Sequence, residues 1–209
     1  PTRAFEAFIG RTEANSPLDL LLLDRFGGAV DVARDTLLMG VAQGLSPNVV
    51  KRQLREHLSA HYGKLDVMVR TEMLGVYRKS TSDTLKANAH LLRGWRWSAS
   101  LSTRTCAMCW ALHGEIFPLD EQMATHPACR CSMSPVVKPW GEINPLFAGI
   151  EAPRQRTGSQ LFAELDEGSQ RQILGPLAFK AYQGKHIRLD DLVEETYSPT
   201  WGKGRRRRG

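Results

Sequence analysis

The sequence lacks any apolar run close to the roughly 18 to 20 residues that a helix needs to cross a bilayer. Its start also lacks the basic region, apolar stretch and small-residue cleavage site of a secretory signal. We therefore expect a globular protein with no membrane partner. Hydrophobic residues make up 42% of the 209 residues and include five tryptophans, which is ample material for a packed core.

Net charge is also scarce outside the C-terminal tail. The formal net charge is +6, and five of the six charges come from the tail, so the remaining residues carry only about one. A neutral body argues against sequence-specific readout of nucleic acid. We expect the tail to stay mobile and to contact DNA phosphates, an acidic protein surface or nothing specific. The nucleic-acid candidates are Lys203, Arg205, Arg206, Arg207 and Arg208.

Residues 1–92 carry the sequence signals of a helical domain. Ser16-Pro17 and Ser46-Pro47 each place a capping serine before a proline, which is typical of a helix start. Gly27-Gly28 is expected to separate the first two helices. Apolar residues then recur every three or four positions, as on the buried face of a helix.

The pattern changes after the third helix. We expect that helix to run from near Lys64 to Leu91-Leu92, with a break near residues 79–82 and with Gly94 ending it. Trp95 and Trp97 then alternate with polar residues, which is typical of a half-buried strand that carries two tryptophans into a core.

These patterns predict an α+β protein in four parts. Prolines and glycines recur between residues 135 and 158 and indicate an extended connector. Helical patterns resume after it, and Gly184 is expected to end a helix that contains residues 177–182. The predicted parts are a helical domain of residues 1–92, a Cys/His metal-stapled β module of residues 93–140, the connector of residues 141–158, and a C-terminal helical segment with the basic tail at residues 159–209.

All four cysteines lie in one short stretch, as a Cys-x-x-Cys pair at Cys106 and Cys109 and a Cys-x-Cys pair at Cys129 and Cys131. Two such pairs on separate turns can converge on one tetrahedral ion. His126 is a fifth candidate, because a turn at the following proline would bring it to Cys129. We predict a structural zinc site of Cys106, Cys109 and Cys129, with His126 or Cys131 as the fourth ligand.

Two disulfides are an alternative, although Cys106 and Cys109 are too close in sequence to pair comfortably with each other. Buried thiols without a metal are a second alternative. His113-Gly114-Glu115 is similar to the His-x-Glu element of zinc deaminases, but it follows the Cys-x-x-Cys pair instead of preceding it. We expect His113-Gly114 to form a turn, and we expect no catalytic residue and no enzyme activity.

Five sequence blocks, in this order and spacing, resemble the phage Mu F-like minor head protein family. A weaker likeness continues to about residue 195, and Ser102 departs from the acidic residue that members often carry. The blocks are Arg70-Thr71-Glu72, Gly94-Trp95-Arg96-Trp97, Arg104-Thr105-Cys106-Ala107-Met108-Cys109, Leu112-His113-Gly114 and His126-Pro127-Ala128-Cys129-Arg130-Cys131.

The resemblance implies a role in assembly. Proteins of this family enter the procapsid, associate with the portal region and are needed for head assembly, and their Cys/His cluster is regarded as a metal site. The resemblance implies a minor capsid protein of the virion that is assembled in the host cytoplasm. Its partners would be the portal protein or the major capsid protein and, through the tail, packaged DNA. The alternative is an intracellular zinc-stabilised DNA-binding protein that uses its basic tail.

Overall fold

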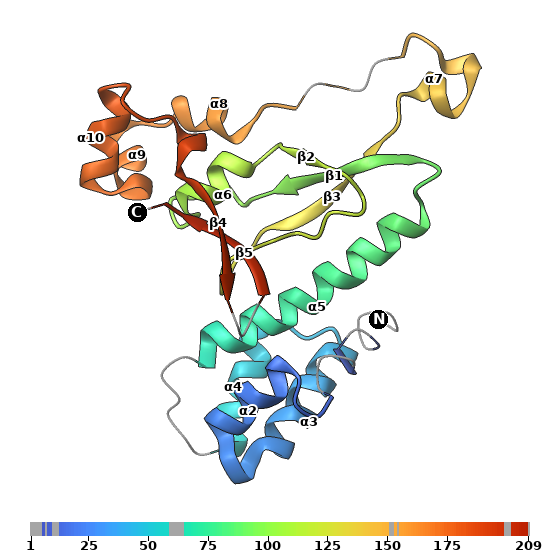
Figure 1. Cartoon of the computed structure of the whole chain (residues 1–209), viewed down its shortest axis with the longest axis vertical. Helices are drawn as coiled ribbons and strands as arrows, with labels where there is room; N and C mark the ends of the chain where they lie inside the picture. The colour runs from blue at the N-terminus through green and yellow to red at the C-terminus, as the bar shows by residue number, and fades with distance from the viewer. Residues whose placement is uncertain are drawn as a thin grey trace. The chain divides into compact units, whose positions relative to one another are not determined.

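A computed structural model describes residues 6, 8–9, 13–58, 65–150, 153, 155–198 and 202–208 (Figure 1). Helices and small sheets are both present, so the predicted α+β class is confirmed. The chain divides into two compact units. The first comprises Pro1–Thr81, Thr125–Cys129 and Tyr197–Gly204, and the second comprises Ser82–Ala124, Arg130–Thr196 and Arg205–Gly209.

Both serine-proline start signals lie at helix starts, and a short 3-10 turn at the paired glycines separates the first two helices, as expected. The Ser16 side chain accepts a hydrogen bond from the Asp19 N–H at 3.1 Å and so caps the first of them. The helices of this region are α2 (Pro17–Phe26), α3 (Val30–Ala42), α4 (Pro47–Leu58) and α5 (Leu65–Ala87), with the turn η1 (Gly27–Ala29) between α2 and α3.

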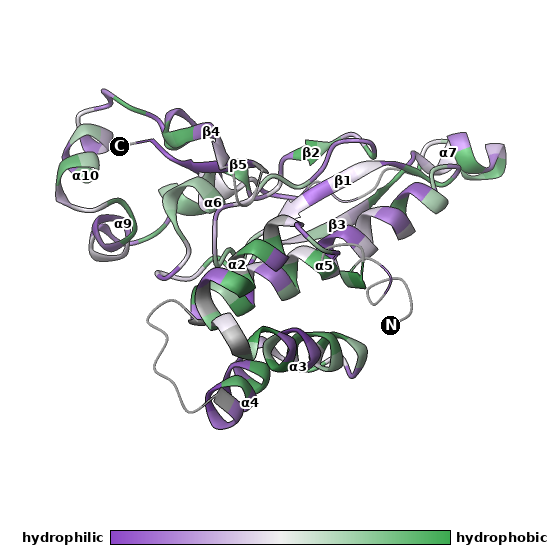
Figure 2. Ribbon diagram, turned by 60° about the horizontal axis from the view of Figure 1, so that its bottom comes forward, coloured by the Kyte–Doolittle hydropathy of each residue, from purple (hydrophilic) through white to green (hydrophobic). Residues whose placement is uncertain are grey.

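Apolar side chains from α2 to α5 share one core, and the apolar faces of these helices are green in Figure 2. The fully or nearly fully buried members include Leu22, Leu37, Val41, Leu54 and Met73. Burial of aliphatic side chains at this density is a sufficient driving force for a helical bundle.

The expected break in α5 near residues 79–82 is wrong, because the helix continues to Ala87. Thr81 fits in the helix interior because its hydroxyl donates a hydrogen bond to the Tyr77 carbonyl at 2.9 Å. The expected end at Gly94 is also wrong, since Gly94 lies inside a strand. A Cβ there would collide with the Phe117 carbonyl, so glycine allows the two backbones to approach closely.

The predicted tryptophan strand is confirmed as β1 (Leu92–Ser98), the centre of a three-stranded antiparallel sheet. Its neighbours are β2 (Ile116–Phe117) and β3 (Ser132–Val137). Trp95 and Trp97 are fully buried, and the Trp95 ring stacks on Phe117 with 4.6 Å between centroids. Both tryptophans are therefore core residues, as expected.

The C-terminal helices form a second core with α6 (Ala107–Leu112). Gly184 ends a helix, as predicted. The connector has more regular structure than expected, because it contains two short helical turns. The elements are α7 (Trp140–Ile143), η2 (Pro145–Phe147), α8 (Gly158–Ala163), α9 (Glu167–Leu174), α10 (Pro176–Gln183) and η3 (Leu189–Leu192).

The expectation of a mobile tail is wrong. β4 (Val193–Ser198) and β5 (Gly202–Arg207) pair as a two-stranded sheet. The arginines of β5 meet acidic residues of β4, with Arg205 3.5 Å from Glu195 and Arg206 3.0 Å from Glu194. Opposite charges on paired strands stabilise the pairing, a contribution that the charge block considered alone does not reveal.

Candidate metal centre

Helix α6 positions the first cysteine pair. Cys106 is its N-cap residue and Cys109 lies in its first turn, three residues later, so both sulfurs project from the same face. Another side of α6 is anchored in the second core, where the Trp110 ring meets Phe162 edge to face at 5.7 Å. The helix is thereby held in place independently of its cysteines.

A tight turn positions the remaining candidates. The Cys129 N–H donates to the His126 carbonyl at 3.2 Å, which closes a four-residue turn with Pro127 at its second position. Ala128 at the third position has a φ of +58°, as a type II turn requires. The predicted turn at the proline is confirmed.

Two side chains of α5 hold this turn. The Ala128 N–H donates to the Thr71 hydroxyl oxygen at 2.8 Å, and the same hydroxyl donates to the Val67 carbonyl at 2.6 Å. The Arg78 guanidinium donates to the Cys129 carbonyl at 2.6 Å. The backbone on both sides of Cys129 is therefore fixed by side chains far away in sequence.

The structure gathers all five predicted ligands into two overlapping groups. Within each group, one candidate ligand atom from each residue lies within 4.8 Å of the others. Cys106, Cys109 and His126 form one group, and Cys109, Cys129 and Cys131 form the other. Cys109 belongs to both groups, which makes it the central candidate. The choice between His126 and Cys131 as fourth ligand stays a prediction.

The orientation of His126 suits a metal ligand. Its Nδ1 lies 2.8 Å from the Pro127 carbonyl oxygen, which can only accept a hydrogen bond, so Nδ1 carries the proton in this contact. In a neutral ring the lone pair is then on Nε2. A backbone carbonyl that fixes the tautomer in this way is a common partner of metal-binding histidines.

The residues present fit a zinc ion chemically. Thiolate sulfur and imidazole nitrogen are the ligands of structural zinc sites, and four of them complete a tetrahedral site. Cys109, Cys129 and Cys131 are each at most 6% exposed. Burial disfavours a thiolate unless a cation or another strong partner compensates, and a metal ion supplies that compensation.

His113 stands apart from these groups and forms the predicted turn with Gly114, whose φ is +91°. The Ala99 N–H donates to His113 Nδ1 at 3.1 Å, so this nitrogen must carry a lone pair. Burial, together with the nearby Arg96 charge, lowers the pKa of His113 below its usual value. The ring is therefore a neutral structural acceptor.

The arginines of the tail bond within the chain. Arg205 is 7% exposed, donates to Glu121 at 2.8 Å, and lies over the Phe117 ring with 5.0 Å to the centroid. Arg207 donates to the Leu174 carbonyl at 2.5 Å. Lys203, Arg206, Arg207 and Arg208 are exposed. A role of these residues in binding DNA stays a prediction.

Thr71 and Arg78 were missed as contributors to the centre. Thr71 lies within the Arg70-Thr71-Glu72 block, so its position in a family motif was the only available signal. Nothing in the local sequence marks Arg78, because its partner is a backbone carbonyl 51 residues away.

Residues 31–134 match the sequence model of the family described as Phage Mu protein F like protein. The matched segment contains α3 from its second residue onward, helices α4 to α6, strands β1 and β2, and all five candidate ligands. The weaker likeness expected up to residue 195 lies beyond it. Neither the curated proteins nor the solved structures gave a significant match.

Proposed function

Since this chain belongs, through residues 31–134, to the phage Mu protein F-like family of head morphogenesis proteins, we propose that it is a minor structural protein of a phage head. In this proposal the Cys/His centre holds one structural zinc ion. The role is one of assembly, and no residue is assigned to catalysis. None of the helices that the structure describes has the length and apolar composition to span a bilayer.

The observation that carries the proposal is that the family match contains the whole ligand set, together with the α5 residues that hold it. Thr71 and Arg78 fix the backbone around Cys129, and α6 presents Cys106 and Cys109. A site built from separate elements and held from outside in this way is typical of a structural metal site.

Zinc would bond the turn at residues 126–129, which has little apolar surface to pack, to α6, which is anchored in the second core. Cys106 and Cys109 would bind it from α6, and Cys129 from the turn, with His126 or Cys131 in the fourth position. Structural zinc contributes on the order of 10 kcal/mol to the folding of small metal-dependent modules.

The wider role is association with other components of the phage head. We infer that the portal protein or the major capsid protein is the partner and that the chain acts in head assembly or DNA packaging. DNA contact by the tail would be limited to its exposed members, since Arg205 is bonded to Glu121 and Glu195. The exposed members are Lys203, Arg206, Arg207 and Arg208. Arg207 would have to give up its bond to the Leu174 carbonyl. Arg206 would have to give up its contact with Glu194.

Elemental analysis paired with thiol counting tests the zinc proposal. We expect about one zinc per chain, and we expect Cys109→Ser to abolish it because Cys109 belongs to both groups. Comparing His126→Asn with Cys131→Ser identifies the fourth ligand, since only one of them should lose tight binding. His113→Asn is the matched histidine control and should retain the metal. Absence of both metal and reactive thiols in the native protein would instead establish disulfides.

The assembly role has its own test. A phage lacking this chain should yield few filled heads, and the wild-type chain supplied separately should restore them. An unchanged yield of filled heads would contradict the role, whatever the metal content.

A further inference from the structure

Residues 140–150, which comprise α7, η2 and the turn after them, form a small prefolded unit that we call the apolar knob. The Trp140 ring meets Phe147 edge to face, with 6.5 Å between centroids. The Asn144 side chain accepts the Leu146 N–H at 3.0 Å, and the Ile150 N–H donates to the Phe147 carbonyl at 3.2 Å. The knob therefore holds its own conformation through internal bonds.

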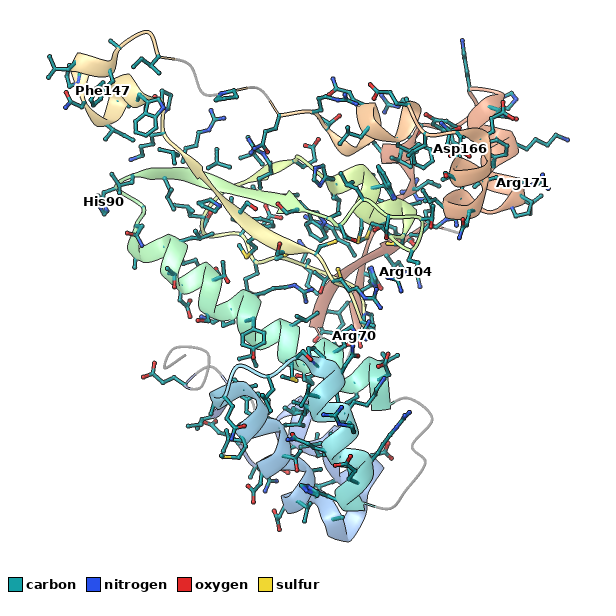
Figure 3. All side chains as sticks on the ribbon, turned by 180° about the vertical axis from the view of Figure 1, so that it is seen from behind. Arg70, His90, Arg104, Phe147, Asp166 and Arg171 are labelled. Carbon is teal, nitrogen blue, oxygen red and sulfur yellow. The ribbon has the colours of Figure 1, made fainter. Side chains whose placement is uncertain are left out.

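The knob exposes its large apolar side chains. Leu146 is 87% exposed, and Trp140, Phe147 and Ile150 are each more than 40% exposed. Glu142 is the only charged residue in residues 140–150. Figure 2 shows green, apolar segments on α7, and Figure 3 shows the labelled Phe147 at an end of the chain's second unit, far from Asp166 and Arg171.

Apolar side chains of this size are costly to leave in water. Together the four leave on the order of 400 Å² of apolar surface exposed, which is within the range where a patch on a monomer is often functional. A prefolded apolar element with aromatic residues suits binding, because little conformational entropy is lost when it docks.

We propose that the apolar knob inserts into an apolar groove on another protein of the phage head. This inference rests on the proposed head function and adds the surface through which it is carried out. With one acidic residue and no exposed cluster of charge, the knob is complementary to a groove lined by aliphatic and aromatic side chains, and not to nucleic acid.

A second copy of this chain is a poorer occupant. Two knobs packed against each other would bury only about 400 Å² on each side, about half of the roughly 800 Å² per partner in a stable interface. A groove also buries the flanks and backbone of the knob, and it leaves the partner free to add contacts elsewhere.

The test uses purified full-length chain and phage heads assembled without it. The variant Leu146→Ser with Ile150→Ser removes exposed apolar surface without touching the contact between Trp140 and Phe147. Leu177→Ser in α10 is the matched control, because Leu177 is also 87% exposed but lies outside the knob. We expect the double variant to bind heads at least roughly tenfold more weakly, and the control to bind within about twofold of wild type.

A photo-crosslinking residue at position 146 then identifies the partner. We expect it to label one head protein at apolar positions, while the same residue at position 177 should not. Equal binding by the double variant and the wild type would overturn the knob proposal alone. Failure of the wild type to bind heads would overturn the head function as well. A concentration-dependent dimer in sedimentation that only the double variant loses would replace the groove with a second copy.

Discussion

The helical bundle and the cysteine loop reach a fixed conformation by different physical means. The bundle of α2 to α5 buries a continuous set of aliphatic and aromatic side chains. The loop between β2 and β3, residues 118–131, has no helix or strand, and its buried residues are Ala124, Cys129 and Cys131. Two of these three are candidate ligands.

This difference shows where metal matters. Apolar burial of about 25 cal/mol per Å² stabilises the bundle without any further bond. Ordering the backbone of the loop costs about 1 kcal/mol or more of conformational entropy per residue. Burial of one alanine and two thiols is too small to offset this cost. The hydrogen bonds with Thr71 and Arg78 fix one end of the loop. Near the other end, those from Trp95 and Arg205 hold Glu121. The comparison therefore predicts a metal-dependent loop beside a metal-independent bundle.

Removing the metal should have the largest effect. A strong chelator, or Cys109→Ser, should lower the unfolding free energy of the region around the loop by several kcal/mol, because structural zinc contributes on the order of 10 kcal/mol. No tryptophan lies in α2 to α5, and Trp95, Trp97 and Trp110 are buried in β1 and α6, so unfolding of the region around the loop should change the fluorescence. We expect the fluorescence transition to move to lower temperature while much of the helical circular dichroism remains. Re-added zinc should reverse the effect of the chelator, and a single unchanged transition would contradict the comparison.

A core truncation in the bundle should have the next largest effect, and this effect should not depend on metal. Leu37→Ala removes a fully buried side chain and should cost about 2–5 kcal/mol. Leu20→Ala is the control, because Leu20 is half exposed, and it should cost much less. Zinc content should stay at the wild-type value in both. Loss of zinc in Leu37→Ala would show that the bundle and the centre are not separable in this way.

Local sequence signals predicted those parts of the fold that depend on neighbouring residues. Ser16-Pro17 and Ser46-Pro47 located helix starts because a cap and a proline act within one turn. The alternation around Trp95 located β1 for the same reason. Gly94 misled the prediction, since its role is a close approach to the Phe117 backbone, which only the folded chain reveals.

For the site and the tail, the contacts that could not be predicted from the sequence are those between residues far apart in the chain. Cysteine spacing correctly gathered the candidate ligands, because each pair is local, but the residues that hold Cys129 lie on α5. The tail was mispredicted for the same reason. The charge block itself contains no sign of Glu121 and Glu195, which neutralise Arg205 in the fold.

The support from α5 should contribute less than the metal itself. Thr71→Val keeps the shape of the side chain but leaves the Ala128 N–H without its acceptor, which should cost about 1–3 kcal/mol. Zinc affinity should fall by about tenfold or more, because the loop backbone is held less firmly. Thr81→Val is the matched control, since the Thr81 hydroxyl likewise donates to the carbonyl four residues earlier, that of Tyr77. Competition with a chelating dye measures the zinc affinity of both variants. Equal affinities would show that Thr71 does not position the turn.

The smallest effect should come from His113, which lies in the turn after α6. Its pKa is lowered by burial and by Arg96, so the unfolded chain binds a proton more readily than the folded one. Stability contributed by the neutral ring is therefore complete above its usual pKa of 6.5 and is lost as the pH falls toward the lower folded value.

His113→Asn keeps an acceptor for the Ala99 N–H but cannot titrate. We expect denaturation at pH 7.5 and 5.5 to show a smaller loss in the variant than in wild type, by less than about 1 kcal/mol because the ring is only half-buried. Both proteins share the metal centre, so protonation of its thiolates cancels in the difference. An identical pH dependence would mean that His113 does not sense acid in the folded chain.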